Sequence, residues 1–111
     1  MSDFPQCLLV VTAEVDQAVE AEWNRWYDTV HVPDVLRCPG VRGGRRYVVS
    51  GEISESTHGK VERTARRIYT TIYELDSPAA TTTPEFQAMR GWHQFAPHVR
   101  SRTQTVVPVV A

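Results

Sequence analysis

Hydrophobic and polar residues follow two alternating patterns along the chain. Residues 7–13 form a continuous apolar, β-branched run, which predicts a strand covered on both faces. Asp16 is a suitable N-cap for a helix over residues 17–30. Its apolar residues recur at spacings of three and four, as one helical stripe does: Val19, Trp23, Trp26, Tyr27 and Val30. Pro33 is expected to start a separate short turn reaching Arg37, which Pro39-Gly40 ends.

The middle of the chain predicts two more strands. Residues 41–50 and 64–75 both alternate, and the second has bulky side chains on both faces. Gly43-Gly44 indicates a bulge or a close backbone approach in the first. The polar residues 51–62 between them predict an exposed hairpin loop.

The C-terminal third predicts a helix and a last strand. Residues 76–82 are expected to form an Ala- and Thr-rich linker, with Thr83 as N-cap and Pro84 as the first helical residue. We expect the helix to carry a stripe ending at His93, with Trp92 on an adjacent face, and to be stopped by Pro97. The last strand, 103–110, contains Pro108, which cannot donate to a ladder and so places this strand end at an edge or bulge.

The order β-α-β-β-α-β predicts a single ferredoxin-like α+β domain over residues 1–111. Its sheet would be four-stranded and antiparallel, with both helices on one face. The uncovered face would carry apolar side chains, which is an aggregation hazard unless a second copy covers it. We therefore expect a homodimer that packs sheet against sheet.

Composition excludes several classes of protein. The net charge is −1 with no basic stripe, which argues against nucleic-acid binding. The longest apolar run, 7–11, is too short to span a bilayer, so no membrane association is expected. Cys7 and Cys38 lack metal-site spacing, and we expect them to be reduced thiols in a cytoplasmic protein without a metal site.

One group of motifs is similar to a known family. It comprises Trp26-Tyr27-Asp28-x-x-His31-x-Pro33, Pro39-Gly40-Val41, Arg46-Tyr47, Tyr69-x-x-x-Tyr73-Glu74-Leu75 and Thr83-Pro84-Glu85-Phe86. Together they resemble the signature of the EthD-like group of the dimeric α+β barrel superfamily. The resemblance implies a dimer with a small-molecule cavity between sheet and helices in each protomer. Relatives in the superfamily include polyketide cyclases, muconolactone isomerases, cofactor-free quinol-forming monooxygenases and haem-handling enzymes.

The candidate catalytic residues are His31, Tyr69, Tyr73 and His93. An imidazole with a pKa near ~6.5 can act as acid or base at neutral pH, and a dry pocket favours its neutral, proton-accepting form. Tyr69 and Tyr73 share a strand face and could hold a carbonyl or enolate oxygen, while His93 could approach His31 across the cavity. The alternative is that His31 caps the helix end. Family members often carry two acidic residues before this His, but here Thr29 and Val30 leave it without an adjacent carboxylate.

The candidate substrate-binding residues are aromatic, apolar or basic: Trp23, Trp26, Tyr27, Met89, Arg46 and Arg67. The aromatic ones could equally be core residues. Each arginine could hold a substrate carboxylate or form an ion pair within the barrel.

These features favour a cofactor-independent enzyme on a small apolar, aromatic or polyketide-like substrate. The reaction would start with proton transfer next to a carbonyl, as in cyclisation, isomerisation, dehydration or decarboxylation by a lyase. The alternatives are a cofactor-free monooxygenase of phenols or quinols, and a non-catalytic ligand-binding dimer.

Overall fold

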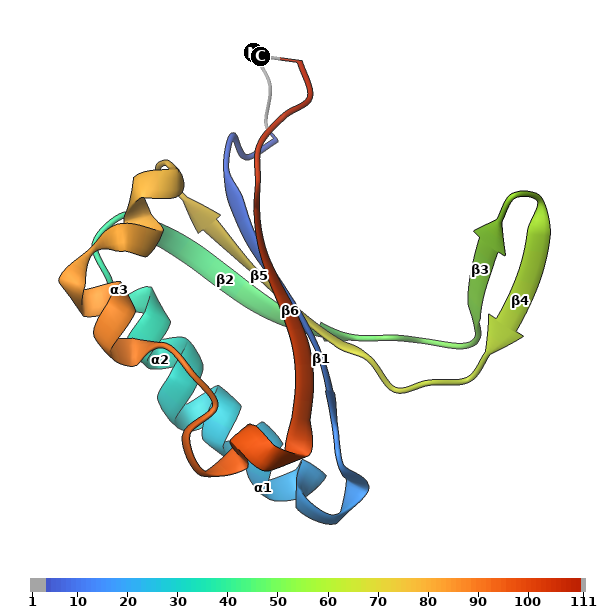
Figure 1. Ribbon diagram of the computed structural model, residues 1–111. Helices are drawn as coiled ribbons and strands as arrows, with labels where there is room; N and C mark the ends of the chain where they lie inside the picture. Colours follow the sequence, from blue (N-terminus) through green and yellow to red (C-terminus); the bar gives the residue numbers. More distant parts are fainter. Residues whose placement is uncertain (1–3, 111) are drawn as a thin grey trace.

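A computed structural model describes residues 4–110, and a four-stranded antiparallel sheet forms its centre (Figure 1). The strands are β1 (Leu8–Val15), β2 (Val41–Val48), β5 (Tyr69–Leu75) and β6 (Val99–Val106), in the order β2-β5-β1-β6. Both chain-terminal strands, β1 and β6, pair directly with each other. This is the predicted ferredoxin-like arrangement, and it is confirmed.

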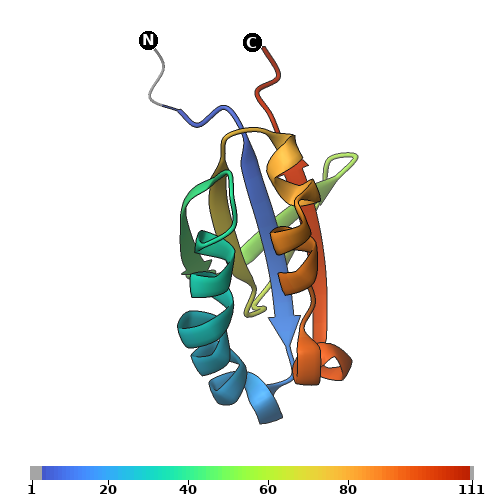
Figure 2. The same cartoon turned by 90° about the vertical axis from the view of Figure 1, so that its left-hand side faces the viewer.

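The helices all lie on one face of the sheet, in two rows (Figures 1 and 2). One row contains η1 (Gln17–Val19), α1 (Glu20–Trp26), η2 (Tyr27–His31) and α2 (Val32–Leu36). Our prediction of a helical break before Pro33 is wrong, because η2 is a π-helical turn that joins α1 to α2. The N–H of Val32 donates to the carbonyl of Tyr27, five residues back. This wider turn accommodates a proline, which lacks an N–H and crowds the turn before it.

The alternation of β1 and β5 sorts their side chains between two faces. Tyr69, Thr71, Tyr73 and Leu75 of β5 are buried against the helices, and the residues between them are half-buried on the other face. In β1, Leu9, Val11 and Ala13 are likewise buried. The period of two along each strand therefore defines the core face.

Two glycines in β2 have the roles that the sequence predicts. A register shift lies between Val41 and Gly43, which is the expected bulge. A Cβ on Gly44 would lie 2.8 Å from Cε1 of Tyr73 and closer still to Cδ1. Only a residue without a side chain fits there, so the Tyr73 ring packs directly on the β2 backbone.

The polar segment after β2 has more regular structure than a loop. It forms a hairpin of β3 (Ile53–Thr57) and β4 (Lys60–Thr64), a separate two-stranded sheet. His58 and Gly59 turn the hairpin with φ of 52° and 82°. The hairpin stands away from the main sheet, on the side opposite the helices (Figure 1). The predicted single strand over 64–75 is wrong at its start, because residues 65–68 are irregular and β5 begins at Tyr69.

The C-terminal third departs most from our predictions. The expected linker over 76–82 contains the 3₁₀ helix η3 (Pro78–Thr82). Thr83 caps α3 (Pro84–Met89) as predicted, since its Oγ1 accepts the N–H of Phe86 at 3.1 Å. The helix then ends at Met89 and not at Pro97.

Backbone conformation explains this early end. Gly91 and His93 have φ of 105° and 51°, both outside the helical region. Pro97 instead lies inside the 3₁₀ helix η4 (His93–His98). Strand β6 begins at Val99, four residues before the predicted start, and ends at Val106, so Pro108 falls outside it.

Three smaller expectations concern the cysteines, Asp16 and the length of the helices. Cys7 and Cys38 are free cysteines, as predicted, and both are buried. Asp16 precedes η1 but caps no helix N–H with its side chain; its carboxylate contacts His98 and Arg100. None of the helices in residues 4–110 has the length and apolarity needed to cross a membrane.

Candidate functional site

A cavity of about 430 Å³ lies between the helices and the sheet. Pockets of ~300–1,000 Å³ are typical for small molecules. Its walls come from β1, β5 and β6 on one side and from η2, α2, η3 and α3 on the other. The lining residues are Leu9, Val11, His31, Val35, Tyr73, Thr81, Thr82, Phe86, Gln87, Met89, Arg90, Gly91, Trp92, Thr103 and Thr105.

His31 is the imidazole in this wall, and three aromatic rings hold it. It is the last residue of the π turn and stacks on Trp26, with ring centroids 4.8 Å apart and planes at 22°. The edge of Tyr27 meets it at 5.2 Å, and Trp92 lies at 5.8 Å. These contacts fix the ring without occupying its nitrogens in any hydrogen bond seen among the described residues.

This environment lowers the pKa of His31 to about 4. The main cause is burial among the rings, which disfavours the charged imidazolium. Electrostatic repulsion from His93 adds to the lowering of this pKa, and the carboxylate of Asp34 opposes it. At neutral pH His31 is therefore an uncharged imidazole that can accept a proton or a hydrogen bond.

Tyr73 lies in the wall of the same cavity and is fully buried. Its hydroxyl has no hydrogen-bond partner of good geometry among residues 4–110. Burial raises its pKa well above the usual value, and the nearby Tyr27 hydroxyl adds to this. Tyr73 therefore stays protonated, and its hydroxyl is buried beside that of Tyr27.

Tyr27 differs from Tyr73 because its hydroxyl is satisfied. Thr71 donates its Oγ1 hydrogen to the Tyr27 oxygen at 2.8 Å, and both side chains are buried. Burial also raises the pKa of Tyr27. This bond fixes the π turn to β5, so Tyr27 positions its neighbour His31 against the sheet.

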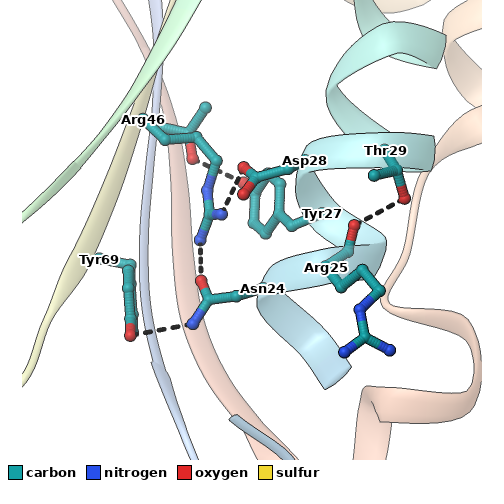
Figure 3. A network of polar contacts seen from close by, with 8 residues as sticks. Asn24, Arg25, Tyr27, Asp28, Thr29, Arg46 and Tyr69 are labelled. Carbon is teal, nitrogen blue, oxygen red and sulfur yellow. Dashed lines mark hydrogen bonds and ion pairs between the residues drawn. The ribbon is translucent and has the colours of Figure 1, made fainter. Parts of the chain in front are cut away.

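Arg46 reaches from β2 toward α1 and holds it to the sheet (Figure 3). It donates to Asp28 Oδ1 and to Asn24 Oδ1, both at 2.7 Å. Its guanidinium carbon lies 4.1 Å from the centre of the Tyr27 ring. These contacts are those of the ion-pair alternative, because they commit the Arg46 charge to neighbouring side chains.

Tyr69 and Arg67 belong to this same end of the interface. The Tyr69 hydroxyl donates to Glu20 and accepts from Asn24 at 3.0 Å and from Arg67 at 2.9 Å (Figure 3 shows the Asn24 contact). Arg67 also forms an ion pair with Glu20 at 2.6 Å. Neither residue lines the cavity, so the structure does not bring them together with His31.

The other sequence candidates divide between core, rim and cavity. Trp23 is fully buried in the aromatic core and Trp26 packs behind His31, while Met89 lines the cavity. His93 is exposed and contacts the edge of Trp26 at 5.8 Å. It does not line the cavity, and its effect on His31 is electrostatic.

Several cavity residues are not among the sequence candidates. The expected place of Trp92 on an adjacent helix face is wrong, because the early end of α3 turns it toward His31, and its Nε1 donates to Ser101 at 2.9 Å. Thr103 and Thr105 line the cavity from β6. In the sequence they alternate with Arg102 and Gln104, and this period of two places both threonines on one face of the strand. Among residues 4–110, no cluster of three or more His, Cys, Asp or Glu side chains could hold a metal ion.

Comparison with solved structures supports the fold. An "ethyl tert-butyl ether d (EthD) family protein" from Bacillus halodurans C-125 superposes with a TM-score of 0.57 over 88% of this chain and 96% of that chain. The identity is 14%, so this likeness concerns the fold, and at that level it confirms the resemblance to the EthD-like group. No functionally curated protein matches the chain. The model of a family described as a domain of unknown function, DUF4286, matches residues 6–102, and the chain belongs to this family.

Proposed function

We propose that the protein is a small-molecule enzyme in which His31 is the general base and Tyr73 the hydrogen-bond donor. The observation that carries the proposal is their shared cavity, in which burial keeps one group unprotonated and the other protonated. An uncharged acceptor and a protonated tyrosine in the wall of one cavity suit proton transfer next to a carbonyl.

The reaction would begin when the neutral imidazole removes a proton from a carbon beside the substrate carbonyl. The electron pair of that C–H bond moves into the carbonyl, whose oxygen becomes negative. The Tyr73 hydroxyl donates a hydrogen bond to this oxygen. His31 then returns its proton to another carbon, which gives isomerisation, or to a leaving hydroxyl, which gives dehydration. In cyclisation the enolate carbon instead attacks a second carbonyl carbon of the substrate, and the oxygen of that carbonyl takes the proton. None of these reactions needs a cofactor.

The low pKa of His31 restricts when it can act. An imidazole with a pKa of about 4 is a weak base before the reaction starts. A negative enolate oxygen beside it favours the imidazolium and so raises its basicity as the reaction proceeds. The base would therefore be strongest in the transition state, where it is needed.

Exchange of substrate hydrogen for deuterium tests this mechanism. Aromatic ketones and phenolic polyketide mimics would be incubated with the protein in D₂O and followed by NMR. H31Q should lower the exchange rate by ~10²–10⁴-fold, the usual contribution of a general base. H58Q, on the hairpin turn, is the matched control and should exchange at the wild-type rate.

Three results would lead to different conclusions. Full exchange by H31Q would contradict the proposed base. Oxygen consumption during turnover would favour the monooxygenase alternative. Tight binding of these compounds without exchange or conversion would favour a ligand-binding protein.

We also propose that the sheet face opposite the helices is covered by a second copy. Val10 and Ile72 lie on this face half-buried, and Tyr47 is 49% exposed. Light scattering should give the mass of a dimer, and I72K should give a monomer because it places a charge in the interface. A wild-type protein that is monomeric at all concentrations would contradict the dimer.

A further inference from the structure

One end of the cavity carries a charge that the protein leaves unpaired. Of the described residues that line it, Arg90 is the single one with a full charge at neutral pH, since His31 is unprotonated and no carboxylate is present. Arg90 directly follows α3 and is exposed at its rim. Arg90 therefore places a positive charge at this entrance.

Arg90 differs from most arginines of the molecule. Arg37, Arg42, Arg46, Arg66, Arg67 and Arg100 each form an ion pair with an acidic side chain. Arg90 forms none within residues 4–110, and its side chain instead donates a hydrogen bond from Nη1 to Gln87 Oε1 at 3.3 Å. Its charge is thus available to a ligand.

Gln87 holds this guanidinium at the cavity. Its Nε2 donates to the carbonyl of Thr81 at 2.7 Å, while its Oε1 accepts from Arg90. The amide therefore ties Arg90 to η3, and all three residues line the cavity. A guanidinium held at one nitrogen keeps other N–H groups free for a planar, bidentate partner such as a carboxylate.

The rest of the cavity suits the remainder of such a ligand. Leu9, Val11, Val35, Phe86 and Met89 form apolar walls. Thr103 and Thr105 offer hydroxyls from β6. His31 and Tyr73 are the uncharged polar groups in its inner wall.

We propose that the cavity takes a small apolar acid, whose anionic group binds Arg90 at the rim and whose body extends toward His31 and Tyr73. The placement of the ligand's reacting end near His31 and Tyr73 rests on the proposed function, whereas the anion site is inferred from Arg90 and Gln87 alone. A carboxylate is the expected anion, and a cationic amine of the same shape is disfavoured.

Two isosteric probes test the anion site: 1-naphthoate, which is negative, and 1-naphthamide, which is neutral. Isothermal titration calorimetry would measure both with the wild type, R90Q, R90K and R42Q. R90Q should weaken naphthoate binding about tenfold, as loss of one charge-assisted hydrogen-bonded pair does, and change naphthamide binding less than twofold. R90K should recover part of the loss, and R42Q, whose arginine pairs with Asp76 on the sheet edge, should match the wild type.

The variant T103W locates the probes, because an indole on this exposed strand position would fill the cavity. It should abolish binding of both. If T103W blocks both probes but R90Q weakens them equally or not at all, the anion site is wrong while the cavity remains the site of the proposed function. If T103W leaves both probes bound, or if neither probe binds the wild type, the cavity does not take apolar acids and this proposal falls, while the exchange experiment with H31Q still decides the proposed function.

Discussion

The two ends of the helix–sheet interface are built differently. At the β2 end, Trp23, Tyr27 and Tyr69 interlock edge to face, and Arg46 ties them to α1. At the other end, aliphatic side chains surround a cavity, and the Tyr73 hydroxyl lacks a partner within residues 4–110. The first end has the dense aromatic packing expected of a scaffold, although Trp23 Nε1 and Arg46 Nε lack a hydrogen-bond partner within residues 4–110. The second end leaves an open cavity, which is what binding a ligand requires.

Trp23→Ala should break the packed end and have the largest effect on stability. Trp23 is fully buried, and truncating such a residue costs ~3–5 kcal/mol of unfolding free energy. Met89→Ala at the cavity should cost no more than ~2 kcal/mol, because Met89 is half-buried and already borders the cavity. Urea denaturation measures both, and equal losses would contradict the contrast.

Gly44→Ala tests how closely the sheet holds the cavity tyrosine. A Cβ there would clash with the Tyr73 ring, and we expect a loss of ~1–3 kcal/mol as the ring is displaced. Gly43→Ala is the matched control, since a Cβ at that position would meet nothing within 4 Å and the loss should stay below ~1 kcal/mol. Similar denaturation midpoints for the two variants would argue against this contact.

The two buried tyrosines should respond differently to loss of the hydroxyl. Tyr27→Phe leaves the buried Thr71 hydroxyl without its acceptor and should cost ~1–2 kcal/mol. Tyr73→Phe removes a hydroxyl that has no partner among the described residues, so stability should change by less than ~0.5 kcal/mol while the exchange reaction slows. A large stability loss in Tyr73→Phe would show that its hydroxyl serves the fold.

His31 should make the stability of the protein depend on pH. Its pKa is about 4 in the folded state and ~6.5 unfolded, so the unfolded chain binds more protons between these values. Stability should therefore fall as pH falls from about 6.5 to about 4, by ~1–2 kcal/mol after allowance for partial exposure. H31Q should lose this part of the pH dependence, and H58Q should keep it. An NMR titration midpoint of His31 near ~6.5 would contradict the assignment.

The sequence predicts the scaffold better than the site, for a physical reason. Strand alternation, the Thr83-Pro84 helix start and Gly43-Gly44 are local signals, and the structure confirms them. The early end of α3 comes from the extended backbone of Arg90 and the positive φ of Gly91, a glycine stop signal that the expected stripe through His93 overrode in our prediction. That end turns Trp92 and Arg90 to the cavity, so the sequence alone does not mark them as site residues. Arg46 and Tyr69 are candidates by residue type, but their partners on α1 can be seen only in three dimensions.

The π turn affects how this helix should be aligned with the corresponding helix of related proteins. Trp23, Tyr27, His31 and Val35 recur every four residues, and all four face the sheet or the cavity. A regular α-helix advances ~100° per residue, so a repeat of four drifts ~40° per step and would carry Val35 about 120° off the face. The wider turn at Tyr27–His31 absorbs this drift. A one-residue deletion there would rotate everything downstream, so a gap in an alignment at this turn marks a different site and not merely a shorter helix.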